Sequence, residues 1–437
     1  MKTLIQHILL LLAVTSVVMA CTGVDDLADT SGQERTAQQQ PVAFSAYVNR
    51  STTRGGATGQ LTTDGTGGTT SLQTSGFGVF GYYTGSRQYN QLSLPNFMYN
   101  QQVTYNGTSE NWEYTPIKYW PNENGTNGSQ NTDYLTFFAY APYAEVDGAT
   151  GCVATNPQSG IVALTRVKDS GDPLVSYYAS LTPSECVDLC WADPHMNKKR
   201  PESISTKEIF NFHHALAALN VQIDADVDAV SGIHTNAVDV NTRIWVRSVT
   251  FEGFALKGQL NLYGGHWYKL DCDCDLSGDP VTICDGRRDR HEGVSATFNE
   301  PLTGLNPIVV QSTAYGDPAL TAGVTNTAVN LFNDNTSATA PVYVIPSGDE
   351  MRVTIEYDVE TRDEKLSSQY LADGRTHGSS IKNTLSATVT DESTNSITLT
   401  AGKKYTITLH LGMASVKADA TVETWQEGDH ADPKVPN

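Results

Sequence analysis

Apolar residues in this chain fall into short alternating or continuous runs, and residues that favour turns separate these runs. Few stretches carry apolar residues at the spacing of an amphipathic helix. Short runs bounded by Gly, Pro, Asn and Asp are typical of β-strands. Polar segments such as residues 121–133 predict surface loops between them. We therefore predict an all-β protein, with strands in residues 76–85, 135–146, 243–254, 341–361 and 404–413.

The start of the chain has the pattern of an export signal. Lys2 supplies a positive charge before an apolar stretch that is too short to span a bilayer, which takes roughly 20 apolar residues. The stretch ends in Val-Met-Ala-Cys, which resembles the lipobox of bacterial lipoproteins and implies a lipid on Cys21. We expect residues 1–20 to be a signal peptide and residues 21–40 to be a lipidated flexible tether. The alternative is an ordinary signal peptide followed by a chance cysteine.

Charge and composition narrow the class of partner. The formal net charge is −20 and the isoelectric point is about 4.8, which argues against a nucleic-acid partner. Charged residues make up only 17% of the chain, so Thr, Ser, Asn, Gln and Gly must form much of the polar surface. This composition is typical of secreted all-β proteins.

The length of 437 residues predicts two or three domains. Residues 195–206 are charged, polar and contain proline, so they suit a linker. The segment 210–227 that follows reads as one long strand with a bend. We therefore expect an N-terminal domain over residues 41–206 and a C-terminal domain over residues 207–437.

Six cysteines follow Cys21, and an even number in an exported chain permits disulfide bonds. Their pairing cannot be read from the sequence. Their spacings differ from the paired two-residue spacings of zinc modules, so we expect no metal. The candidates for disulfide bonds are Cys152, Cys186, Cys190, Cys272, Cys274 and Cys284.

Several segments, taken in order, resemble the fimbrillin family, the subunits of type V pili. No single segment is a specific motif, but the order of the segments covers most of the chain after the tether. The resemblance implies two tandem transthyretin-like β-sandwich domains and assembly by donor-strand exchange after proteolysis. The matching segments are residues 41–56, 77–85, 95–106, 112–122, 137–143, 210–223, 248–262, 342–348 and 402–425.

The first of these segments alternates in polarity. A strand over residues 41–48 would place one set of side chains on a single face, where they can fill an apolar groove. The polar, Gly-rich stretch that follows is open to proteolysis. By resemblance to fimbrillins, a trypsin-like protease would cut this stretch after Arg54 or Arg50, with Arg54 favoured, so that residues 41–54 form a removable first strand. The groove-filling set is Val42, Phe44, Ala46 and Val48.

Two features depart from a generic fimbrillin. Cysteine-containing inserts lie around residues 186–190 and 272–284, and the tail after Trp425 carries Pro433 and Pro436. Because proline removes a donor from a β-ladder, this tail is a poor donor strand. Shaft, tip and accessory roles therefore all stay open.

The resemblance implies an outer membrane lipoprotein precursor that later forms part of a cell-surface pilus. Its expected partners are other pilin subunits, a processing protease, the outer membrane through lipid, and a host glycan or protein. The alternative is a monomeric glycan-binding lipoprotein. A sugar platform could form from nearby aromatic residues, although a core role is favoured: Tyr99, Tyr105, Trp112, Tyr114, Tyr119 and Trp120.

We find no motif for an enzyme or a cofactor. The chain lacks a G-x-S-x-G nucleophile elbow, a phosphate-binding loop and a carboxylate pair in an aromatic setting. His213 and His214 are adjacent in a predicted strand, so they face opposite sides and cannot easily chelate one ion. Asp271, Asp273 and Asp275 alternate like a calcium loop, but the required Gly and Glu are replaced.

Overall fold

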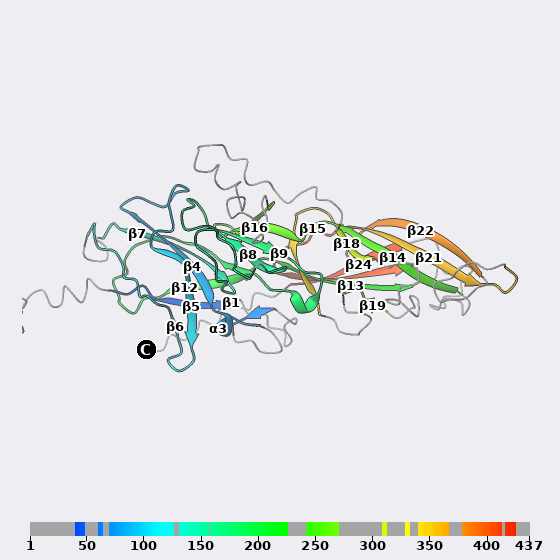
Figure 1. The fold of residues 1–437 in the computed structure, drawn as a ribbon, viewed down its shortest axis with the longest axis horizontal. Coiled ribbons are helices and arrows are strands. Elements are labelled where there is room, and N and C mark those ends of the chain that lie inside the picture. Colours follow the sequence, from blue (N-terminus) through cyan, green and yellow to red (C-terminus); the bar gives the residue numbers. More distant parts are fainter. Residues whose placement is uncertain are drawn as a thin grey trace, which may run out of the picture.

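The computed structural model describes residues 40–48, 60–63, 70–125, 131–155, 157–225, 242–270, 308–312, 328–332, 340–366, 378–412 and 416–424. Nearly all regular structure in these residues is β-strand, as predicted (Figure 1). The described helices are short, α3 over Leu72–Ser75 and the 3-10 turn η2 over Pro183–Glu185. Neither of them has the length needed to cross a membrane.

An eight-stranded sheet forms the N-terminal half of the molecule. The strand order is β1-β12-β10-β7-β4-β5-β6, and β11 also pairs with β7. The first and last strands of this order, β1 and β6, contact each other, so the sheet curls around its inner face. The strands are β1 (Phe44–Val48), β4 (Phe77–Gly85), β5 (Met98–Asn106), β6 (Asn111–Glu113), β7 (Tyr134–Ala141), β10 (Cys190–Ala192), β11 (His195–Lys198) and β12 (Glu208–His214).

Both faces of this sheet are buried. Phe77 and Phe137 point into an aromatic inner core, whereas Phe80 and Phe138 belong to a second core on the opposite face. A four-stranded sheet covers the second face, in the order β17-β16-β9-β8. Its strands are β8 (Gly160–Leu164), β9 (Leu174–Tyr178), β16 (Lys257–Asn261) and β17 (His266–Tyr268). A small parallel pair, β2 (Leu61–Thr62) and β3 (Thr70–Ser71), completes this half.

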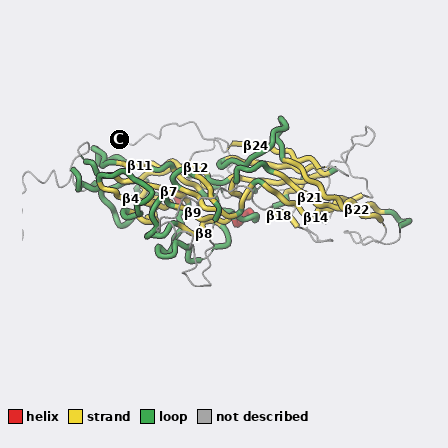
Figure 2. The backbone as a smooth tube through the Cα atoms, turned by 90° about the horizontal axis from the view of Figure 1, so that it is seen from above, coloured by secondary structure: helices red, strands yellow, loops and turns green. Residues whose placement is uncertain are grey.

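Two further sheets face each other across a third core and form the C-terminal half of the elongated molecule (Figure 2). One is six-stranded, with β15 (Phe254–Ala255), β20 (Val342–Pro346), β13 (Ala217–Ala225), β23 (Lys403–Leu411), β24 (Val416–Thr424) and β19 (Val329–Asn330). The other is four-stranded, with β18 (Ile308–Ser312), β14 (Thr242–Glu252), β21 (Arg352–Arg362) and β22 (Gly378–Thr388). The arrangement is a β-sandwich.

The chain passes between the two halves at Ala215 and Leu216. The segment expected to be one bent strand is β12 in the eight-stranded sheet, followed by β13 in the six-stranded sheet. The expected boundary at residue 206 does not separate the sheets. Both β12 and β16 lie beyond that residue, yet they pair with β1 and β9. The expected domains, residues 41–206 and 207–437, therefore do not coincide with the two halves that the sheets form.

Candidate functional site

The first described strand, β1, carries the polarity pattern that the sequence predicts. The side chains of β1, and those of Val42 and Ala43 just before it, alternate between buried and half-buried. Ala43, Ser45 and Tyr47 form the half-buried set. The buried set is at most 6% exposed and consists of Val42, Phe44, Ala46 and Val48. All four of these side chains belong to the inner core of the eight-stranded sheet.

Phe44 is the central anchor of β1. Its ring lies 5.5 Å from that of Tyr114, 5.5 Å from that of Phe137 and 5.6 Å from that of Phe210. The three rings come from the segment after β6 and from β7 and β12, so one side chain joins distant parts of the sheet. Aromatic pairs at such distances contribute about 0.5–1.5 kcal/mol beyond the area that they bury.

The backbone of β1 pairs in parallel with β12, from Phe44 opposite Glu208 to Val48 opposite Phe212. β1 stands at the end of the strand order, so within the described sheets β12 is its strand neighbour. The segment just before β1 is held on its other side, where the Val42 N–H donates to the Lys118 carbonyl at 2.9 Å. The Tyr114 hydroxyl donates to the Val42 carbonyl at 2.7 Å.

The end of β1 contacts the segment where the described chain resumes. The Val48 N–H donates to Thr63 Oγ1 at 3.0 Å, and this hydroxyl donates to the Val48 carbonyl at 3.3 Å. Leu61 is buried, and its N–H donates to Asp188 Oδ2 at 2.8 Å. Residues 60–63 are therefore fixed to the body of the protein beside the end of β1.

Several predicted site residues lie outside the described residues. In the sequence, Arg50 and Arg54 fall between Val48 and the segment that Leu61 fixes. A cut after either arginine would therefore separate β1 from residues 60–63. Cys21 also lies outside the described residues. The remaining residues in this group are Asp271, Asp273, Asp275, Cys272, Cys274 and Cys284.

The other three cysteines differ in state. Cys152 is disulfide-bonded, whereas Cys186 and Cys190 are free thiols. A bond between the two cysteines of the CVDLC segment, which the candidate list allowed, is therefore not formed. The partner of Cys152 lies outside the described residues. Burial raises the pKa of the Cys186 thiol to about 11.

The aromatic residues considered as a sugar platform mostly fill cores. Trp120 is buried in the inner core, and the partly buried Trp112 and Tyr114 pack against that core. Tyr99 packs on the opposite face of the sheet and donates to the Thr165 carbonyl at 2.9 Å. Tyr119 is 48% exposed. These residues therefore do not share one exposed face.

An open cleft of about 510 Å³ lies where β17 meets the C-terminal sandwich. Its aromatic side is β17 itself, with His266, Trp267 and Tyr268. The facing wall comes from the turn after β20 and the loop before β23, residues 346–348 and 399–401. Aromatic faces beside polar backbone suit a small ligand with both apolar and hydroxyl-bearing surfaces.

Comparison with known proteins gives the family. A family model described as fimbrillin-like matches residues 62–425. The chain belongs to the fimbrillin-like family. No curated protein matches it. Among solved structures, this fimbrillin-like chain is similar to a fimbrial protein from Bacteroides vulgatus ATCC 8482, with 18% identity, a TM-score of 0.50, and coverage of 88% of this chain and 99% of that one.

A second similar structure is a candidate cell adhesion protein from Bacteroides uniformis ATCC 8492, with 15% identity and a TM-score of 0.35. The alignment covers 88% of this chain and 98% of that one. The likeness to the Bacteroides vulgatus structure supports the fold, and the family model identifies the family.

Proposed function

We propose that this fimbrillin-like protein is a structural or adhesive subunit of a cell-surface pilus, assembled by donor-strand exchange. The observation that carries the proposal is β1, a strand at the end of its sheet that, together with Val42 just before it, places four buried side chains in the inner core. The family of the chain and the likeness of its fold to a fimbrial protein support the same function.

In the proposed pathway, the precursor is exported as a lipoprotein anchored through Cys21 in the outer membrane. A trypsin-like protease then cuts after Arg54 or Arg50. The cut separates β1 and its lipid from the body, which begins again at the fixed residues 60–63. A strand from another subunit replaces β1 in the groove by β-augmentation.

Burial energies explain why a replacement strand is needed. Fully burying Val42, Phe44 or Val48 contributes about 1.5–3 kcal/mol each. Without covalent attachment, β1 still fits its groove and leaves only when a donor of equal or better fit competes. The incoming strand must therefore present an apolar alternation that matches the positions of these side chains.

The test replaces both candidate cleavage residues, as Arg50→Ala with Arg54→Ala, and examines the cell surface. We expect uncut protein that keeps its N-terminal lipid and forms no detergent-resistant polymer. Arg87→Ala is the matched control, because Arg87 is exposed in the turn after β4. Normal polymers built from the double variant, still carrying Cys21, would disprove the mechanism.

A second candidate function is glycan binding by a monomeric surface lipoprotein. The cleft beside β17 favours it, because Trp267 and Tyr268 offer aromatic surface next to the polar turn at Ser347. A glycan-binding monomer would keep Cys21 and stay monomeric in detergent. N-terminal sequencing of protein taken from the cell surface separates the two functions.

A further inference from the structure

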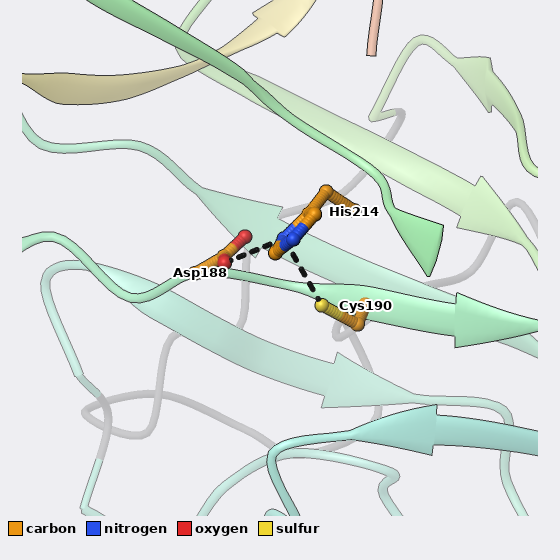
Figure 3. A group of neighbouring side chains, drawn as sticks. All are labelled: Asp188, Cys190 and His214. Carbon is orange, nitrogen blue, oxygen red and sulfur yellow. Dashed lines mark hydrogen bonds and ion pairs between the residues drawn. The ribbon is translucent and has the colours of Figure 1, made fainter. Parts of the chain in front are cut away.

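Three side chains that can bind metal meet in the interior of the N-terminal half (Figure 3). They are Asp188, Cys190 and His214, and their ligand atoms all lie within 4.8 Å of one another. The side chain of Asp188 is 1% exposed and that of His214 is 6% exposed, while Cys190 is fully buried. We propose that this cluster is a binding site for one zinc ion.

The strand register brings the three residues together. Cys190 lies directly opposite His214 in the antiparallel pair of β10 and β12. Directly paired residues place their side chains on the same face, with Cβ atoms about 4.5–5.5 Å apart. Asp188 precedes Cys190 by two residues, so in extended chain it reaches the same face. Two of the three residues therefore lie on neighbouring strands, and Asp188 lies in the segment that leads directly into β10.

The sulfur–nitrogen distance in the cluster suits a metal with mixed ligands. Cys190 Sγ lies 3.5 Å from His214 Nδ1, and Asp188 Oδ2 lies 2.7 Å from the same nitrogen. Zinc binds imidazole nitrogen at about 2.0 Å and thiolate sulfur at about 2.3 Å, so sulfur and nitrogen ligands in a tetrahedron are separated by a distance close to that between Cys190 Sγ and His214 Nδ1. The distance from Asp188 Oδ2 to the same nitrogen is that of a hydrogen bond, so the carboxylate would move away from Nδ1 when zinc binds. Carboxylate, imidazole and thiolate together suit zinc rather than calcium or magnesium, which take oxygen ligands.

The charges point to a divalent cation. Asp188 Oδ1 is buried and accepts no hydrogen bond from the described residues. A buried carboxylate that is incompletely paired is costly. Zinc would bind the Asp188 carboxylate, neutral His214 and the Cys190 thiolate, so the total charge of the occupied site is zero. The thiol proton of Cys190 leaves to solvent when the zinc–sulfur bond forms.

The environment of the other imidazole nitrogen is consistent with this role. Metal binding through Nδ1 requires the proton of neutral His214 to sit on Nε2. Gln60 places its side-chain amide 3.4 Å from Nε2, and the oxygen of that amide can accept the proton after a rotation of the amide plane. A hydrogen bond of this kind commonly fixes the ring of a metal-binding histidine.

The same geometry argues against a cysteine nucleophile. In a nucleophile–histidine–carboxylate relay, the nucleophile and the carboxylate contact opposite nitrogens of the imidazole. Here Cys190 and Asp188 both contact Nδ1. The Cys190 thiol is also fully buried, so a substrate could not reach it.

The test uses the purified full chain, stripped with a chelator and then loaded with Zn²⁺ or Co²⁺ alone. We expect one zinc per chain by elemental analysis. Cobalt should give a thiolate-to-metal charge-transfer band from its bond to Cys190. Wild-type protein that retains no stoichiometric zinc, or whose cobalt spectrum lacks the thiolate band, overturns the proposal.

Matched variants assign the metal to this cluster. Cys190→Ser should abolish the thiolate band, and His214→Asn should weaken zinc binding at least about tenfold. Cys186→Ser and His213→Asn are the controls, because Cys186 lies outside the cluster and His213 faces Trp191 and Asp193. If Cys190→Ser does not fold, Asp188→Asn, which keeps the side-chain volume, takes its place and should weaken zinc binding at least about tenfold. A cobalt spectrum unchanged in the cluster variants contradicts the site.

Discussion

The Thr63 hydroxyl accepts a hydrogen bond from the Val48 N–H at 3.0 Å and donates one to the Val48 carbonyl at 3.3 Å. Through this one side chain, the end of β1 is joined to the segment that follows the candidate cleavage sites. The contact does not depend on the connecting chain, so it would survive a cut after Arg50 or Arg54.

Replacing Thr63 by Val removes this hydroxyl while it keeps a similar shape. Each lost hydrogen bond costs about 0.5–1.5 kcal/mol, so we expect Thr63→Val to lower the free energy of unfolding by about 1–3 kcal/mol. Urea denaturation of the uncut protein measures the change. Thr421→Val on the exposed face of β24 is the control and should change stability by less than about 0.5 kcal/mol. Equal free energies of unfolding for Thr63→Val and Thr421→Val would show that the contact between Thr63 and Val48 does not stabilise the protein.

Tyr114 gives the docking of β1 an alkaline pH dependence. Burial raises the pKa of Tyr114 from 10.0 to about 12. The unfolded chain therefore ionises first, so the contribution of this group is complete below pH 10 and is lost as the pH rises towards 12. Tyr114→Phe removes both this titration and the hydrogen bond to the Val42 carbonyl.

We therefore expect Tyr114→Phe to cost about 0.5–1.5 kcal/mol at pH 8 and to lose stability less steeply than wild type above pH 10. Denaturant melts at several pH values give the comparison. Tyr263→Phe serves as the control, because Tyr263 is 52% exposed. Parallel stability curves for wild type and Tyr114→Phe would contradict the role of the hydroxyl.

The sequence alone predicted features that depend on local periodicity. Alternation along residues 42–48 follows from the two-residue repeat of a strand, and this burial pattern is confirmed. The same repeat places His213 and His214 against different neighbours, Trp191 and Asp188. The all-β class follows from the many short runs.

Features that depend on strand pairing could not be predicted in this way. The contact of Val48 with Thr63 spans 15 positions, and that of His214 with Asp188 spans 26. No local signal marks such partners, because the register of distant strands sets them. The change of sheet at Leu216 was missed for the same reason. A bend was visible in the sequence, but the sheet that each arm joins was not.

The described cysteines should differ in their response to alkylation. With chelator, denaturant and no reductant, we expect alkylation to label Cys186 and Cys190 but not Cys152. Mass spectrometry of the peptides measures this, and reduction beforehand should add the label on Cys152. In the folded protein at pH 8, Cys186 should react slowly, because its pKa of about 11 leaves little thiolate. A peptide in which Cys186 is linked to Cys190 would contradict these assignments.

Phe44 should decide how firmly β1 occupies its groove. Its ring contacts three other aromatic rings in the inner core, so truncation leaves a cavity that a curled sheet cannot easily close. We expect Phe44→Ala to cost about 3–5 kcal/mol of unfolding free energy in the uncut protein. Ser45→Ala, on the half-buried face of the same strand, should cost far less.

The larger consequence concerns assembly. If β1 blocks the groove until a donor strand replaces it, Phe44→Ala should release the strand faster once trypsin has cut the connecting segment. Released strand, measured by size-exclusion chromatography and mass spectrometry, should appear earlier than in wild type, and polymers should form sooner. Ser45→Ala should follow wild type in both measurements. Equal rates of release and polymer formation for Phe44→Ala and wild type would mean that occupation of this groove does not control assembly, even if the variant is less stable.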